Sequence, residues 1–164
     1  MKEKDKKYLI KLAKLTASFA IPLLAAFIGS IFTASTVSTW YTALIKPGFN
    51  PPNWIFGPVW TLLYLLMGFS LFLVWKKGLK KKYVKEGLII FGIQIFLNVL
   101  WSLLFFGLQS PLLAFIEIIF LWAAVLFMII YFYKVNKTAA YVQIPYILWV
   151  SFAALLNLSI VLLN

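Results

Sequence analysis

Long apolar runs separated by short polar segments dominate the chain. No charged residue occurs in residues 15–45, 47–75, 118–133 or 138–164. A helix needs about 20 apolar residues to cross the hydrocarbon core of a bilayer, and each run is that long or extends into one that is. Strands are a poor alternative, because a membrane strand requires about ten residues of alternating apolar and polar character, and the sequence has no such segment. The pattern therefore predicts membrane-spanning helices.

Polar and proline-rich segments divide these runs into five spans. Glu117 is the only charge between Glu86 and Lys134, and Gln109-Ser110-Pro111 interrupts that stretch near its middle. Asn53 is a candidate N-cap for the second helix. We predict an all-α five-transmembrane-helix bundle forming a single domain, residues 1–164. Its helices lie at about 15–38, 54–75, 87–108, 111–133 and 141–163, with a loop at about 39–53.

The basic residues predict how the bundle is oriented. All fifteen are lysines: six precede residue 15, six lie within residues 76–85, two follow the fourth span, and Lys46 stands alone. With five spans, fourteen of them share one side, and the positive-inside rule makes that side cytoplasmic. The N-terminus is then cytoplasmic and the C-terminus outside. This clustering argues against a nucleic-acid partner for a chain of net charge +11, and it favours contact with anionic lipid headgroups.

Absent residue types exclude several kinds of chemistry. The sequence contains neither cysteine nor histidine. Disulfides and thiolate sites are therefore excluded, and so are the commonest metal ligand and the usual general base. We predict no metal site, no cofactor and no nucleophile–base pair.

Polar and aromatic residues at membrane depth predict a pocket. Lipid offers no hydrogen bonds, so such residues face the bundle interior. Helical spacing places several of them at overlapping depths in the outer half of four helices, as in a ligand pocket. Packing or hydrogen bonding between helices is the alternative for each. Small residues on the first helix, Gly29 among them, indicate close packing inside the bundle or a dimer contact. The pocket candidates are Trp60, Tyr64, Gln94, Asn98, Trp101, Glu117, Tyr146, Trp149, Ala153 and Asn157.

Three motifs in order resemble the TspO/MBR family, that of the translocator protein or peripheral-type benzodiazepine receptor. They are WYTALIKPGFNPPNWIFGPVWTLLYLLMGFSLFLVW at 40–75, QIFLNVLWSLLFF at 94–106 and IPYILWVSFAALLN at 144–157. The likeness covers nearly the whole chain and points to a bacterial-type member in the cell membrane. It implies a five-helix bundle, usually a homodimer, whose hydrophobic pocket is closed by the first loop.

The resemblance also implies ligands. Such proteins bind porphyrins, including protoporphyrin and haem, as ligands rather than cofactors, and animal members bind cholesterol and benzodiazepine-type drugs. Some bacterial members degrade protoporphyrin in a light- and oxygen-dependent reaction that needs pocket tryptophans. By motif, those tryptophans correspond to Trp60 and Trp149. The chain ends without the tyrosine–arginine cholesterol motif of animal members, which makes a sterol role doubtful.

The proline-rich loop is interpreted as a lid over this pocket. Prolines restrict the loop, so it loses less entropy when it closes over a ligand. Lys46, the only lysine on its side, could meet a propionate near the mouth, and Phe49 stands where relatives often have tryptophan. The predicted lid residues are Trp40, Lys46, Pro47, Pro51, Pro52 and Trp54. Tyr41 and Phe49 add ring surface beneath them and are further ligand-binding candidates of the pocket.

Three functions remain open at this point. The first is a membrane receptor or transporter for porphyrins and similar hydrophobic ligands. The second is an enzyme that photo-oxidises protoporphyrin, with Trp60 and Trp149 as the candidate residues. The third is a structural membrane subunit without a ligand.

Overall fold

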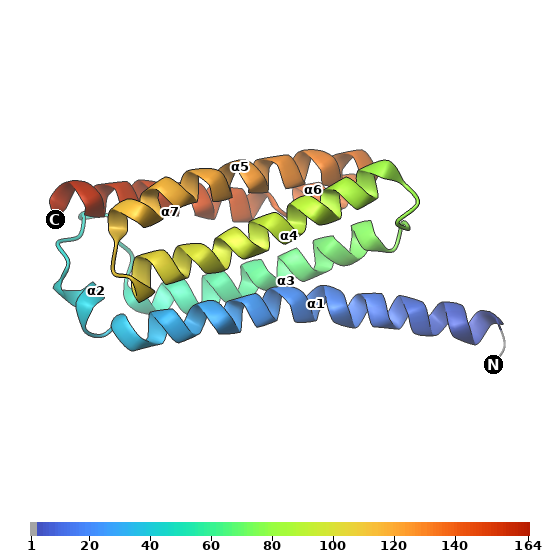
Figure 1. The fold of residues 1–164 in the computed structure, drawn as a ribbon, viewed down its shortest axis with the longest axis horizontal. Helices are drawn as coiled ribbons and strands as arrows, with labels where there is room; N and C mark the ends of the chain where they lie inside the picture. The colour runs from blue at the N-terminus through green and yellow to red at the C-terminus, as the bar shows by residue number, and fades with distance from the viewer. Residues whose placement is uncertain (1–2) are drawn as a thin grey trace.

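The computed structural model describes residues 3–164, and its regular structure there is entirely helical (Figure 1). Five helical segments are long and apolar enough to cross a membrane within the described residues, which confirms the predicted all-α five-span fold. The elements are α1 Glu3–Thr36, α2 Trp40–Ala43, the 3₁₀ turn η1 Asn53–Ile55, α3 Phe56–Trp75, α4 Lys82–Ser102, the π-helical turn η2 Leu103–Gly107, α5 Pro111–Val135, α6 Lys137–Tyr141 and α7 Ile144–Leu163.

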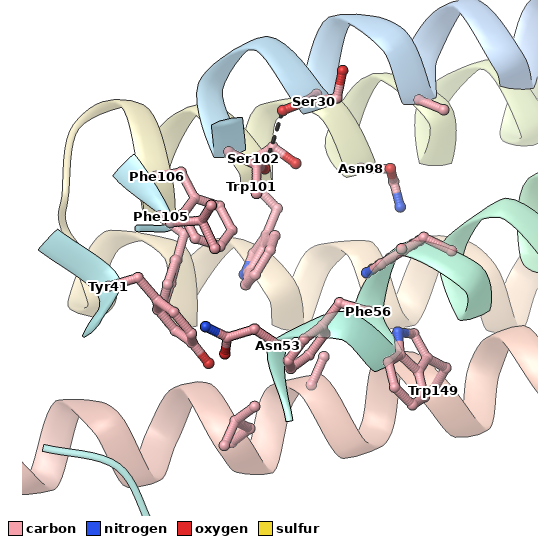
Figure 2. A pocket seen from close by; sticks show the side chains of 18 of the residues that line it. Ser30, Tyr41, Asn53, Phe56, Asn98, Trp101, Ser102, Phe105, Phe106 and Trp149 are labelled. Carbon is pink, nitrogen blue, oxygen red and sulfur yellow. Dashed lines mark hydrogen bonds between the residues drawn. The ribbon is translucent and has the colours of Figure 1, made fainter. Parts of the chain in front are cut away.

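Two local features differ from the sequence prediction. Helix α1 begins at Glu3, well before its apolar run, and its first turn carries Glu3 and Asp5, which favour a helix N-terminus. Glu3 also pairs with Lys7 one turn on, at 2.7 Å between carboxylate and ammonium. Asn53 does not cap the second span: it begins η1, Pro52 precedes it, and no side chain makes a capping hydrogen bond there. Instead, the Asn53 side chain faces a cavity (Figure 2).

Small residues set how closely the helices approach. Helix α1 packs on α3 and on α4, α4 packs on α5, and α5 packs on α7. At the α1–α3 crossing, a Cβ on Gly68 would lie 3.0 Å from both the Phe19 Cα and the Ser18 carbonyl oxygen. At the α1–α4 crossing, a Cβ on Gly29 would lie 3.2 Å from the Ser102 hydroxyl. Gly29 thus packs inside the bundle, as close helix contact in lipid requires.

The two ends of the bundle differ in character. The end that carries the 76–81 loop is solid: Val74, Val84, Met128 and Phe132 are fully buried there. A buried hydroxyl there is also paired: the Ser70 hydroxyl donates to the Ala139 carbonyl at 2.7 Å. We call this the lysine-rich end; its assignment to the cytoplasm stays a prediction. The opposite end, near α2 and the C-terminus in Figure 1, contains the cavity.

Replacing Gly68 with alanine should destabilise the bundle. The new methyl would meet backbone atoms of α1 that cannot move aside, so we expect a loss of about 1–3 kcal/mol, as for other overpacked sites. The measurement is the midpoint of thermal unfolding in detergent. Gly92→Ala is the matched control, because a Cβ there meets nothing within 4 Å. Equal midpoints for the two variants would contradict this account of the α1–α3 contact.

Candidate functional site

A cavity of about 530 Å³ lies between α1, α3, α4 and α7, beneath α2 and η1 (Figure 2). None of its lining residues comes from α5, so the remaining four spans enclose it. The structure brings together these residues of the predicted pocket: Tyr41, Trp60, Tyr64, Asn98, Trp101, Trp149, Ala153 and Asn157. The spacing of polar and aromatic positions therefore located most of the wall.

Four of the predicted pocket residues lie elsewhere. Gln94 and Tyr146 are fully buried behind the wall, and Glu117 is buried on α5. Both carboxylate oxygens of Glu117 lack a hydrogen-bond partner among the described residues. Phe49 lies in the loop with 54% of its surface exposed, and its ring contacts Phe152 at a centroid distance of 6.2 Å. None of the four lines the cavity.

The predicted lid covers the cavity differently from the sequence interpretation. Trp40, Lys46, Pro47, Pro51, Pro52 and Trp54 do not line the cavity. Trp54 is 74% exposed, so most of its surface lies outside the packed bundle. The rings that cover the cavity at this end are those of Tyr41 on α2 and Phe56 at the start of α3. The prolines therefore shape the loop without touching the space beneath it.

Contacts with α7 and within the loop hold this cover in place. The Ile45 backbone N–H donates to the Asn164 side-chain oxygen, and the Asn164 amide donates back to the Ile45 carbonyl, each at 3.0 Å. The Lys46 ammonium donates to the Thr42 and Leu44 carbonyls at 3.3 and 3.2 Å, and it lies 4.8 Å from the centre of the Tyr41 ring. Lys46 thus stabilises the end of α2.

Tyr41 is held as a neutral group at the cavity mouth. Its hydroxyl donates to the Asn50 side-chain oxygen at 2.9 Å. Burial raises the pKa of the Tyr41 phenol, and the hydrogen bond to Asn50 partly offsets that rise. At neutral pH, Tyr41 therefore presents an uncharged ring to the cavity.

Stacked and edge-on rings form one wall of the cavity. Trp101 stacks on Phe105 with centroids 5.0 Å apart, and Phe105 meets Phe106 edge-on at 4.9 Å. The π-helical turn η2, closed by the Leu108 N–H to Leu103 carbonyl bond of 2.7 Å, carries both phenylalanines. Because this wide turn shifts the angular spacing of side chains, Phe106 joins Trp101 and Phe105 on the cavity side. The sequence carried no signal for that turn.

On the facing wall, the rings come from α3 and α7. Phe56 meets Trp149 at 6.0 Å, and Trp149 lies 5.5 Å from Phe152. Trp60 lies 5.7 Å from Tyr64. Phe56 lies on the same face of α3 as Trp60, and Phe152 lies on the same face of α7 as Trp149. Helical spacing in the sequence could therefore have identified Phe56 and Phe152 as wall residues.

A hydrogen-bonded cluster forms the cavity floor. The Tyr64 hydroxyl donates to the Asn98 side-chain oxygen. The Asn98 amide donates to the Tyr146 hydroxyl at 3.1 Å, which donates in turn to the Gln94 side-chain oxygen at 2.9 Å. Gln94 and Tyr146 therefore act behind the wall, where they fix the two polar residues that face the space, Tyr64 and Asn98.

Two tryptophan N–H groups in the wall differ in their hydrogen bonding. The Trp101 indole N–H donates to the Asn157 side-chain oxygen at 3.2 Å, and the Asn157 amide donates to the Pro111 carbonyl at 2.8 Å. The Trp149 indole N–H is buried and has no partner among the described residues. Trp149 therefore carries a buried, unpaired donor beside the cavity.

The cavity also reaches the membrane-facing surface between α1 and α3. Phe27, Ser30, Gly57 and Thr61 line the cavity and are exposed on the bundle surface as well. Two hydroxyls at this side opening are satisfied by their own helices: Ser30 donates to the Phe27 carbonyl at 2.7 Å and Thr61 to the Gly57 carbonyl at 2.9 Å. The side opening is thus largely apolar and faces the acyl chains.

Comparison with known proteins agrees with this architecture. Residues 18–163 match the TspO/MBR family. The tryptophan-rich protein TspO of Archaeoglobus fulgidus is 47% identical over 156 residues, which cover 94% of this chain and 99% of the relative. Its Chlorobaculum tepidum counterpart is 45% identical over 152 residues, 92% and 96% of the two chains. The human translocator protein is 36% identical over 138 residues, 83% and 81% of the two chains. The chain is an integral membrane protein and belongs to the TspO/MBR family.

Proposed function

We propose that this translocator-type membrane protein binds porphyrins and similar flat, hydrophobic molecules in the cavity. The observation that carries the proposal is the enclosure of one space by rings from α2, α3, α4, η2 and α7. Its volume of about 530 Å³ lies within the range of about 300–1,000 Å³ that small-molecule sites occupy. A tetrapyrrole is a flat apolar disc, so it can stack against such ring faces.

Polar groups in the wall would orient the ligand. The free indole N–H of Trp149 can donate to a ring nitrogen or to a carboxylate. Most donors of the floor are already used within the cluster of Tyr64 and Asn98. The propionates of a porphyrin would therefore point towards the mouth, where Asn53 lines the cavity and Lys46 lies nearby over Tyr41.

The side opening suggests how such a ligand would reach the cavity. A porphyrin partitions into membranes, and an apolar opening between α1 and α3 lets it pass without crossing a polar barrier. The loop above is held by Asn164 and Asn50, so access from the aqueous side requires those contacts to break. The name of the human relative, translocator protein, fits a protein that takes up and releases a ligand.

A second candidate function is light-dependent oxidation of the bound porphyrin. Trp60 and Trp149 both line the cavity, where each ring would lie against an excited ligand and dissolved oxygen. Reaction would depend on light, on molecular oxygen as the oxidant, and on these two indoles. The receptor or transporter function requires none of the three.

Filling the cavity should weaken porphyrin binding. Ala153→Leu adds three carbons to a wall residue, and we expect an affinity for protoporphyrin at least about tenfold lower. Quenching of tryptophan fluorescence during titration of the purified protein in darkness measures it. Ala34→Leu is the matched control, since Ala34 is exposed and does not line the cavity. An affinity for protoporphyrin that is unchanged in the Ala153→Leu variant would refute this site.

Replacing Trp149 with phenylalanine should have a moderate effect on binding in the dark. It removes the free N–H donor, and a net hydrogen bond is worth about 0.5–1.5 kcal/mol, roughly two- to tenfold in affinity. Trp122→Phe is the control, because Trp122 lies on α5 away from the cavity and donates to Ser151. Comparison of lit and dark samples then separates the two functions. Product that forms only in light, and that disappears in Trp60→Phe and Trp149→Phe but not in Trp122→Phe, would favour the enzyme.

Metal-free protoporphyrin should bind about as tightly as haem. The chain has no histidine or cysteine to ligate iron. The two tyrosine hydroxyls at the cavity are already bonded, Tyr64 to Asn98 and Tyr41 to Asn50. Parallel titrations with the two ligands, followed by absorption spectra of the haem complex, test this. A low-spin haem spectrum together with a many-fold higher haem affinity would show an axial ligand and contradict the prediction.

A further inference from the structure

An open cleft on the surface of the lysine-rich end has no role in the proposed function. It measures about 430 Å³ and lies between the first turns of α1 and the end of α3. Helix α1 extends past its neighbours here (Figure 1). We call it the lysine cleft; its lining residues are Lys7, Ile10, Lys11, Lys14, Lys76 and Lys77. Five of the six are cationic, and no described acidic residue lines the cleft.

Helical spacing and a tight turn bring these lysines together. Lys7, Lys11 and Lys14 follow i, i+4 and i+7 on α1, so they share one face. The Lys14 ammonium donates to the Trp75 carbonyl at 3.3 Å, which holds this face against the end of α3. Helix α3 ends at Trp75, and Gly78 has φ +93°, a left-handed conformation that suits glycine and turns the chain just after Lys77. The cleft is thus built by the backbone of two elements.

Some of the five ammonium groups already have local partners. Lys7 pairs with Glu3 at 2.7 Å, Lys14 caps α3, and the Lys76 ammonium lies 5.3 Å from the centre of the Phe72 ring. Among the described residues, neither the Lys11 ammonium nor the Lys77 ammonium has a hydrogen-bond or ion-pair partner. The five ammonium groups repel one another, and an anion with more than one negative charge relieves this repulsion most. Such an anion would be held between Lys11 and Lys77.

The position of the cleft relative to the membrane surface indicates which anion would bind there. Trp75 ends α3 and is a residue type enriched where membrane meets water, so the lysines beside it lie among lipid phosphates. On another side of α1, Tyr8 and Leu12 are 67% and 45% exposed, and they can contact the membrane surface. We propose that the lysine cleft binds a multiply charged phosphate group, carried by an anionic lipid headgroup or by a soluble phosphate.

Native mass spectrometry of the detergent-solubilised protein tests the site directly. The probes are dioctanoyl phosphatidic acid, dioctanoyl phosphatidylcholine and inorganic pyrophosphate. We expect phosphatidic acid to bind and phosphatidylcholine not to bind, because only the former carries a dianionic phosphomonoester. Lys11→Gln/Lys77→Gln should weaken phosphatidic acid binding at least about tenfold, as loss of two charge-assisted contacts does.

A charge-matched variant separates the cleft from general attraction. Lys80→Gln/Lys85→Gln removes the same charge from the same end, at exposed residues outside the cleft. We expect it to change the affinity by less than about twofold. Equal weakening in the two variants, or no binding of phosphatidic acid or pyrophosphate to the unmodified protein, would overturn the proposal. Pyrophosphate that binds as tightly as phosphatidic acid identifies a soluble phosphate as the ligand, whereas much weaker binding identifies the lipid. Equal unfolding midpoints establish that both variants are folded.

Discussion

A chain of hydrogen bonds from Tyr64 through Asn98 and Tyr146 to Gln94 joins α3, α4 and α7 beneath the cavity. In lipid an unpaired polar group costs several kcal/mol, so these side chains must find one another. Each bond requires its two helices to stay at a fixed separation and rotation. Because these hydrogen bonds link three helices at one level, they set the floor of the cavity, above which the helices diverge. The space above that floor depends on this constraint.

The same helices meet in two different ways along their length. Towards the lysine-rich end, Gly68 lets α1 and α3 approach until their backbones nearly touch. Towards the other end, large rings separate the helices: Phe56 and Trp60 on α3 contact Trp149 and Tyr146 on α7. Rings this large cannot interdigitate as small residues do, so the bundle is solid at one end and hollow at the other. A preformed hollow spares a ligand the cost of opening it.

The sequence predicted the spans well because hydropathy and length decide them in lipid. It also placed Trp60, Trp101 and Trp149 around one shared space, since helical spacing fixes which residues face inwards. It did not separate residues that line the cavity from those that brace them. Gln94 and Asn98 lie one turn apart on the same face of α4, yet only Asn98 lines the cavity. Gln94 lies behind the wall, where its side-chain oxygen accepts a hydrogen bond from Tyr146. The π-helical turn and the exposure of Trp54 depend on local backbone geometry and tertiary contacts, which no periodic pattern records.

Selectivity at such a site follows from where the remaining polar groups lie. Hydrogen-bonding groups discriminate strongly between ligands when a wrong ligand leaves them unpaired. Here most wall groups are satisfied within the protein: Tyr64 by Asn98, Trp101 by Asn157 and Tyr41 by Asn50. Trp149 alone among the described wall residues keeps a buried N–H without a partner. Under the proposed function, recognition would rest on the shape of the aromatic walls, with few polar contacts: the Trp149 N–H and the groups at the mouth, Asn53 and Lys46. If the cavity binds ligands as proposed, it would accept flat hydrophobic molecules of several kinds and reject those too thick to enter between the rings.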